Sequence, residues 1–113
     1  MEEVFEIAEY SDDSTPVLSV RGEIDVSTAP ELRDRLLGVA QDGYSTVVVD
    51  LSEVTFLDST ALGVLVSGLK RFRSAGGDLR LVVTGRNVTK VLEITGLVEV
   101  FPIFDSVSEA VST

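Results

Sequence analysis

The sequence predicts an α/β fold, in which a mixed, mostly parallel sheet of about five strands is packed with about four helices. Two observations lead to this fold class. Short apolar runs alternate with stretches of helical periodicity, and residues 46–51 form a nearly continuous β-branched run that is typical of a strand covered on both faces. Because strand–helix–strand crossovers are right-handed, the strands should be parallel except for an antiparallel first strand. The length of 113 residues predicts one domain, residues 1–113.

The N-terminal part is predicted to form a hairpin followed by a helix. Residues 3–10 and 16–22 have the apolar pattern of strands, and the polar residues 11–16 are expected to form the turn between them. Thr28-Ala29-Pro30-Glu31 has the spacing of a capping box, so a helix should begin there. Gly43 is its expected stop.

After the buried run, residues 52–58 are expected to form a loop that leads into a second helix starting near Ser59. The apolar residues of that helix recur at helical spacing, and Gly76-Gly77 should end it. Residues 78–84 are the next predicted strand.

The remaining elements are shorter. Asn87 is expected to cap a third helix that stops near Gly96. Residues 98–103 are predicted to form a last short strand, and residues 106–111 a short terminal helix.

Composition excludes several classes of function. The chain has no cysteine and no histidine, so a disulfide framework, thiolate or imidazole metal ligands and a Ser-His-Asp triad are impossible. No glycine-rich phosphate cradle is present either. We therefore expect a protein that is not an enzyme and that uses no metal or cofactor.

Charge and hydropathy narrow the partners and the location. A net charge of −10 repels nucleic acid and anionic membranes. The densest basic cluster, Lys70, Arg71 and Arg73, is expected on the last turns of the second helix, where it complements the dipole. The acidic start Met1-Glu2-Glu3 and the lack of a long apolar run predict a cytoplasmic protein with no secretory leader or membrane span.

The start of the second helix is the candidate site. Asp58 is the expected N-cap, accepting from the N–H of Thr60 or Ala61, which places Ser59 at the first helical position with a free hydroxyl. In a parallel sheet this position lies at the carboxyl ends of the strands, next to the turn Gly22-Glu23-Ile24-Asp25. A phosphoryl group on Ser59 would be partly stabilised by the helix N-terminus. The alternative is that these residues only cap the helix.

A resemblance favours the regulatory interpretation. Residues 51–65, Leu-Ser-Glu-Val-Thr-Phe-Leu-Asp-Ser-Thr-Ala-Leu-Gly-Val-Leu, resemble the signature of the STAS domain, in particular of the single-domain anti-sigma-factor antagonists of bacteria. Arg21-Gly22-Glu23-Ile24-Asp25 resembles the family's turn after its second strand. Gly76-Gly77 resembles its glycine turn, and Ile94-Thr95-Gly96-Leu97 its segment after the third helix. The fold implied is STAS-like.

The resemblance implies a phosphoprotein that regulates transcription through a sigma factor, in a stress response or in sporulation. Unphosphorylated antagonist binds an anti-sigma factor, which is an ATP-dependent serine kinase of the histidine-kinase-like ATPase fold, and the sigma factor is released. Ser59 matches the serine that this kinase phosphorylates, after which the antagonist dissociates until a metal-dependent serine phosphatase resets it. The protein would act as a monomer, with weak self-association left open. An alternative within the family is a subunit of a lipid-transport complex or of a stress-sensing scaffold.

Seven further residues are candidates for contact with the partner or kinase: Glu23, Asp25, Asp58, Thr60, Ala61, Gly63 and Leu97. Most of them have an equally simple structural explanation. Asp25 could orient the kinase or cap its own loop, and Gly63 could permit close packing on the sheet or on a partner. Leu97 could contact a partner or complete the C-cap at Gly96.

Two other residues carry open alternatives. Asp50 is expected to bond the amides of residues 52–54 in preference to a ligand, and Thr60 is a second hydroxyl that could accept the phosphoryl group. No basic residue is expected beside the site. A phosphoryl group on Ser59 would therefore be repelled by Asp58 and, if close enough, by Asp25.

Overall fold

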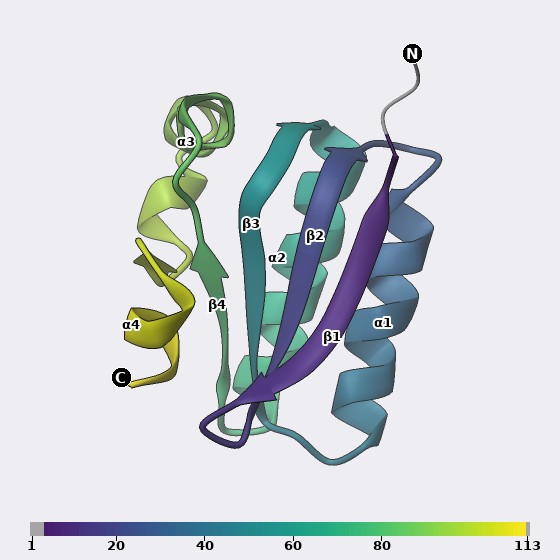
Figure 1. Ribbon diagram of the computed structural model, residues 1–113, viewed down its shortest axis with the longest axis vertical. Helices are drawn as coiled ribbons and strands as arrows, with labels where there is room; N and C mark the ends of the chain where they lie inside the picture. Colours follow the sequence, from purple (N-terminus) through teal and green to yellow (C-terminus); the bar gives the residue numbers. More distant parts are fainter. Residues whose placement is uncertain (1–3, 113) are drawn as a thin grey trace.

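The computed structural model describes residues 4–112 and confirms the predicted fold class. Five strands form one sheet in the order β1-β2-β3-β4-β5, with β1 antiparallel to β2 and the other neighbours parallel (Figure 1). The elements in chain order are β1 (Glu6–Asp12), β2 (Thr15–Ile24), α1 (Ala29–Gln41), β3 (Thr46–Leu57), α2 (Ser59–Ser74), β4 (Asp78–Val82), α3 (Arg86–Ile94), a 3₁₀ turn (Leu97–Glu99), β5 (Ile103–Phe104) and α4 (Val107–Val111).

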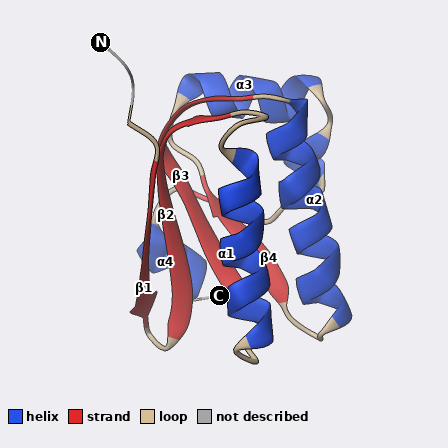
Figure 2. Cartoon of the chain, turned by 90° about the vertical axis from the view of Figure 1, so that its right-hand side faces the viewer, coloured by secondary structure: helices blue, strands red, loops and turns tan. Residues whose placement is uncertain are grey.

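Helices cover the sheet unequally. α1 and α2 lie side by side on one face, and α4 lies on the other, as Figure 2 shows. The main core fills the space between the sheet and the first two helices, and α3 adds Val88 and Leu92 to it. A smaller core under α4 joins Val17, Val48 and Val82 to Ala110. Arg80 Nη1 donates to the carbonyl oxygen of Ala110 at 2.7 Å, which fastens α4 to β4.

The hairpin between β1 and β2 is tighter than predicted. The expected turn 11–16 is wrong, because the strands pair up to Asp12 and Thr15 and leave only Asp13 and Ser14 between them. Both turn residues have positive φ, 51° and 65°, the backbone of a turn that matches the twist of a hairpin. Polar residues at a sheet edge can pair through the backbone while their side chains stay in water, so polarity overstated the length of the turn.

β3 is twice as long as predicted, and the expected loop 52–58 is wrong. The strand continues to Leu57 because β2 pairs with it as far as Ile24, opposite Leu57. For the same reason the expected turn at Gly22–Asp25 belongs mostly to β2, with an irregularity in register between Gly22 and Glu23. Polar residues in this stretch obscured a strand whose partner is distant in the sequence.

The C-terminal third departs from prediction in three places. The strand expected at 78–84 ends at Val82, and the strand expected at 98–103 is reduced to Ile103–Phe104, preceded by the 3₁₀ turn.

Asn87 is not the cap of α3, which begins at Arg86 after Gly85. Its Nδ2 instead donates to the carbonyl oxygen of Thr55 at 3.4 Å. The predicted stop of this helix at Gly96 and the terminal helix are confirmed.

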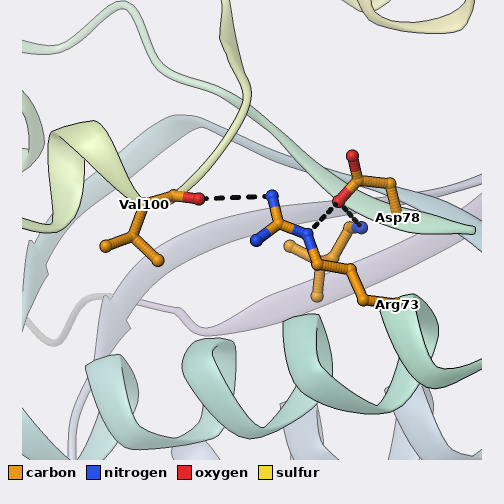
Figure 3. Close-up of polar contacts among 4 residues, drawn as sticks. Arg73, Asp78 and Val100 are labelled. Atoms are coloured by element: carbon orange, nitrogen blue, oxygen red, sulfur yellow. Dashed lines mark hydrogen bonds and ion pairs between the residues drawn. The ribbon is translucent and has the colours of Figure 1, made fainter.

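The basic cluster lies where it was expected. Arg71 and Arg73 are in the last turn of α2, and Lys70 is exposed beside them. Arg73 Nε lies 3.1 Å from Asp78 Oδ1, and its Nη2 donates to the carbonyl oxygen of Val100 at 3.3 Å (Figure 3). Arg73 therefore ties the end of α2 to β4 and to the segment before Phe101.

Candidate functional site

Two neighbouring strands bring the candidate site together. Ile24 pairs with Leu57, and the backbone N–H of Asp58 donates to the carbonyl oxygen of Ile24 at 3.1 Å. Asp25 and Asp58 therefore follow adjacent strand ends. We call this end of β2 and β3 the carboxyl edge, and both α1 and α2 begin there (Figure 1).

Asp58 caps α2 as predicted. Its Oδ1 accepts from the N–H of Ala61 at 3.0 Å, and its own backbone is extended. Ser59 is consequently the first helical residue. It is exposed, and no hydrogen bond to another described residue occupies its hydroxyl. The hydroxyl is accessible to another protein, as a phosphoacceptor requires.

The cap gives a prediction for stability. Asp58→Ala should lower the free energy of unfolding by about 1 kcal/mol, because the N–H of Ala61 loses its side-chain partner. Asp58→Asn retains a capping oxygen without the charge and should lose much less. Chemical denaturation of the three proteins measures both effects. Equal losses in the alanine and asparagine variants would mean that charge, and not the hydrogen bond, matters at this position.

Asp25 caps the loop that leads into α1. Its Oδ1 accepts from the N–H groups of Ser27 at 2.9 Å and of Thr28 at 3.2 Å. The capping box predicted at Thr28 is therefore wrong: the Thr28 hydroxyl accepts from the N–H of Asp25 and donates to the carbonyl oxygen of Glu23, both at 2.9 Å. The backbone before α1 therefore occupies the Thr28 hydroxyl, which is not available to cap the helix. The pattern of residues 28–31 alone does not reveal these contacts.

The remaining candidates differ in exposure. Glu23 and Thr60 are exposed at or near the carboxyl edge. Ala61 is fully buried in the main core, so its methyl group packs inside the protein and cannot meet a partner. Leu97 is half-buried and packs against that core, next to Gly96 at φ 77°, which is the arrangement expected of a C-cap.

Gly63 does not pack closely on the sheet. A Cβ built there has no neighbour within 4 Å, and the residue is exposed. Gly68 is the glycine of α2 that touches the core, since a Cβ there would lie 2.9 Å from Leu79 Cδ1. Gly63 therefore does not serve close packing on the sheet, and its contact with a partner stays a prediction.

Asp50 has a structural role, as expected. Its Oδ1 accepts from the backbone N–H of Ser52 at 3.0 Å and from the Ser52 hydroxyl at 2.6 Å. It lies within β3 and not at its end, because the strand continues to Leu57.

Sequence reasoning missed a groove between α1 and α2. It has a volume of about 500 Å³ and reaches Thr60, the neighbour of Ser59. We call it the helix groove; its lining is Arg33, Leu36, Leu37, Thr60, Gly63, Val64, Ser67, Gly68, Arg71 and Phe72. Arg33 of α1 and Thr60 of α2 both line this groove, and the expectation that no basic residue lies beside Ser59 stays a prediction. The residues from α2 recur at helical spacing, but only the packing of two helices brings Arg33 to them.

The chain matches known proteins over most of its length. The family model of the STAS domain matches residues 6–110. The anti-sigma-B factor antagonist of Bacillus subtilis (strain 168) is 36% identical over 86 residues, which is 76% of this chain and 78% of that protein. An anti-sigma factor antagonist from Mycobacterium paratuberculosis is similar in structure, with a TM-score of 0.88, 30% identity, and coverage of 96% of this chain and 92% of that one.

A more distant structure shares the fold. The Bacillus cell fate determinant SpoIIAA, solved in its phosphorylated form, has a TM-score of 0.71 at 19% identity and covers 96% of this chain and 97% of its own. Within residues 4–112, none of the helices has the length and apolar character needed to cross a membrane.

Proposed function

Because the chain belongs to the STAS domain family, we propose that it is an anti-sigma-factor antagonist controlled by phosphorylation of Ser59. The unphosphorylated protein binds an anti-sigma-factor serine kinase and frees the sigma factor. Phosphorylation of Ser59 ends that binding, and a serine phosphatase restores the original state. The chain is thus a regulatory binding protein and not an enzyme.

One observation carries the proposal: the Ser59 hydroxyl is exposed at the first position of α2, directly after the Asp58 cap. A helix N-terminus has free N–H groups and a partial positive charge, which stabilise an added phosphoryl group in the free protein. The residue can therefore be modified without unfolding its surroundings.

Electrostatics explains why the modified protein would dissociate. A phosphoserine adds about −1.5 to −2 charges beside the Asp58 carboxylate. In the free protein, water and the helix N-terminus offset this charge. In a tight interface the dianion must lose its water, which is unfavourable by several kcal/mol unless the partner supplies cations. Since about 1.4 kcal/mol corresponds to a tenfold change in affinity, release needs no change of fold.

Phosphorylation itself is the first test. The chain is incubated with ATP and each candidate anti-sigma-factor kinase of its organism, and the modified peptide is mapped by mass spectrometry. We expect one phosphoryl group, on Ser59, with no incorporation into Ser59→Ala and normal incorporation into Thr60→Ala. A phosphoryl group mapped to Thr60 would show that the assignment of Ser59 as the acceptor is wrong. If no kinase modifies the chain, a role in a transport complex or scaffold becomes the better hypothesis.

A further inference from the structure

The helix groove is lined by cations in a chain that is acidic overall. The chain has 19 acidic and 9 basic residues, yet no acidic residue lines the groove, which contains Arg33 from α1 and Arg71 from α2. Both arginines are exposed, and neither forms an ion pair with another described residue. Arg21, Arg35 and Arg73 are each paired with a carboxylate of this chain. The groove therefore presents two unneutralised cations.

The floor between these arginines is apolar. Leu36 and Phe72 are buried at its base, and Leu37 and Val64 are half-buried along it. Gly63 leaves the upper part of the groove open, because no side chain projects there. An apolar floor between cations fits a ligand that is itself apolar on one side and acidic at its margins.

The shape favours a protein segment over a small molecule. The groove is open to solvent along one side, whereas small-molecule sites enclose most of their ligand's surface. From Thr60 to Phe72, α2 contributes residues at intervals of three and four, a stripe that extends for roughly 18 Å along the helix. A helix of about three turns has the length and the spacing of contacts to lie in such a groove.

We infer that the helix groove binds an acidic, amphipathic helical segment of the anti-sigma factor. This inference rests on the proposed function and extends it. The upper end of the groove is Thr60, so the bound segment would lie next to Ser59. A phosphoryl group there would repel the acidic segment. Phosphorylation would thus weaken two contacts at once, at the carboxyl edge and in the groove.

Charge reversal in the groove tests the inference. The partner is the kinase found to phosphorylate Ser59, and its affinity for the unphosphorylated chain is measured by isothermal titration calorimetry. Arg33→Glu and Arg71→Glu should each weaken binding about tenfold, with a smaller dependence on salt than the unmodified protein shows. Lys70→Glu is the matched control: it makes the same change of charge on exposed α2 surface next to Arg71 but outside the groove. It should change the affinity less than twofold.

Crosslinking identifies the occupant independently of affinity. Because the chain has no cysteine, Ser67→Cys in the groove can be labelled uniquely with a photoreactive maleimide, with Lys70→Cys as the control outside it. Ser67→Cys should crosslink to an acidic segment of the kinase with apolar residues at helical spacing. Thermal denaturation of each variant checks that it is folded.

The outcomes separate the two hypotheses. If the kinase binds and Arg33→Glu and Arg71→Glu behave like Lys70→Glu, the groove is not part of the interface and only the proposed function stands. Crosslinks to a basic or wholly polar segment also contradict the inference. If the unmodified chain binds no anti-sigma-factor kinase, the proposed function fails and the groove loses its assigned occupant with it.

Discussion

Ser59→Ala is expected to bind the anti-sigma-factor kinase equally well with and without ATP, whereas Ser59→Glu should bind about 100-fold more weakly. Alanine cannot be phosphorylated and adds no charge. Glutamate places a permanent negative charge at the exposed start of α2, beside Asp58, which the interface would have to desolvate. Calorimetric titration of the kinase with each variant measures the difference.

Ser108→Glu is a suitable control for this experiment. It introduces the same charge at an exposed position of α4, on the face of the sheet opposite to α1 and α2, and should leave the affinity nearly unchanged. Equal affinities of the unmodified protein, Ser59→Ala and Ser59→Glu would rule out a charge-controlled contact at this serine. A loss in Ser59→Ala as large as that in Ser59→Glu would instead show that the hydroxyl itself is needed for binding.

Gly77→Ala is expected to lower the free energy of unfolding by roughly 2–4 kcal/mol. A Cβ at this position would lie 1.8 Å from the carbonyl oxygen of Ser45, so the backbone must move. That oxygen accepts from the N–H of Asp78, which begins the pairing of β4 with β3. Moving it breaks a backbone hydrogen bond where the central strands start. Urea denaturation followed by circular dichroism measures the loss.

Gly38→Ala provides the comparison. This glycine lies within α1, and a Cβ there has no neighbour within 4 Å. The substitution should raise stability by about 0.5–1 kcal/mol, through the better helix propensity of alanine. If Gly77→Ala proves as stable as Gly38→Ala, the connection between α2 and β4 adapts more easily than its geometry indicates.

Local contacts made parts of the site predictable. The cap of α2 joins Asp58 to Ala61, three residues further along the chain, so the pattern of nearby residues contains all that is needed. The end of α3 at Gly96 is predictable for the same reason, since a left-handed residue after a helix favours glycine. The alternation of apolar runs with helical patterns was enough for the order of most elements.

Contacts between segments that are distant in the sequence could not be predicted from patterns of neighbouring residues. The second half of β3 has the polar sequence of a loop, and its pairing with β2 makes it a strand. Asn87 has the sequence position of a helix cap, but its side chain donates to the carbonyl oxygen of Thr55 instead. The helix groove is the clearest example, because Arg33 and Arg71 belong to different helices. Nothing in the pattern of either helix reveals the cation that the other contributes.

The backbone hydrogen bond from Asp58 to Ile24 limits how far the start of α2 can move when the charge at Ser59 changes. Ile24, Leu57 and Ala61 are almost wholly inaccessible to water, so the polypeptide on both sides of Ser59 is anchored in the interior. Displacing it would require local unfolding, which the loss of so much apolar contact opposes. Both forms of the protein should therefore present one shape, and a binding partner would distinguish them by surface potential alone.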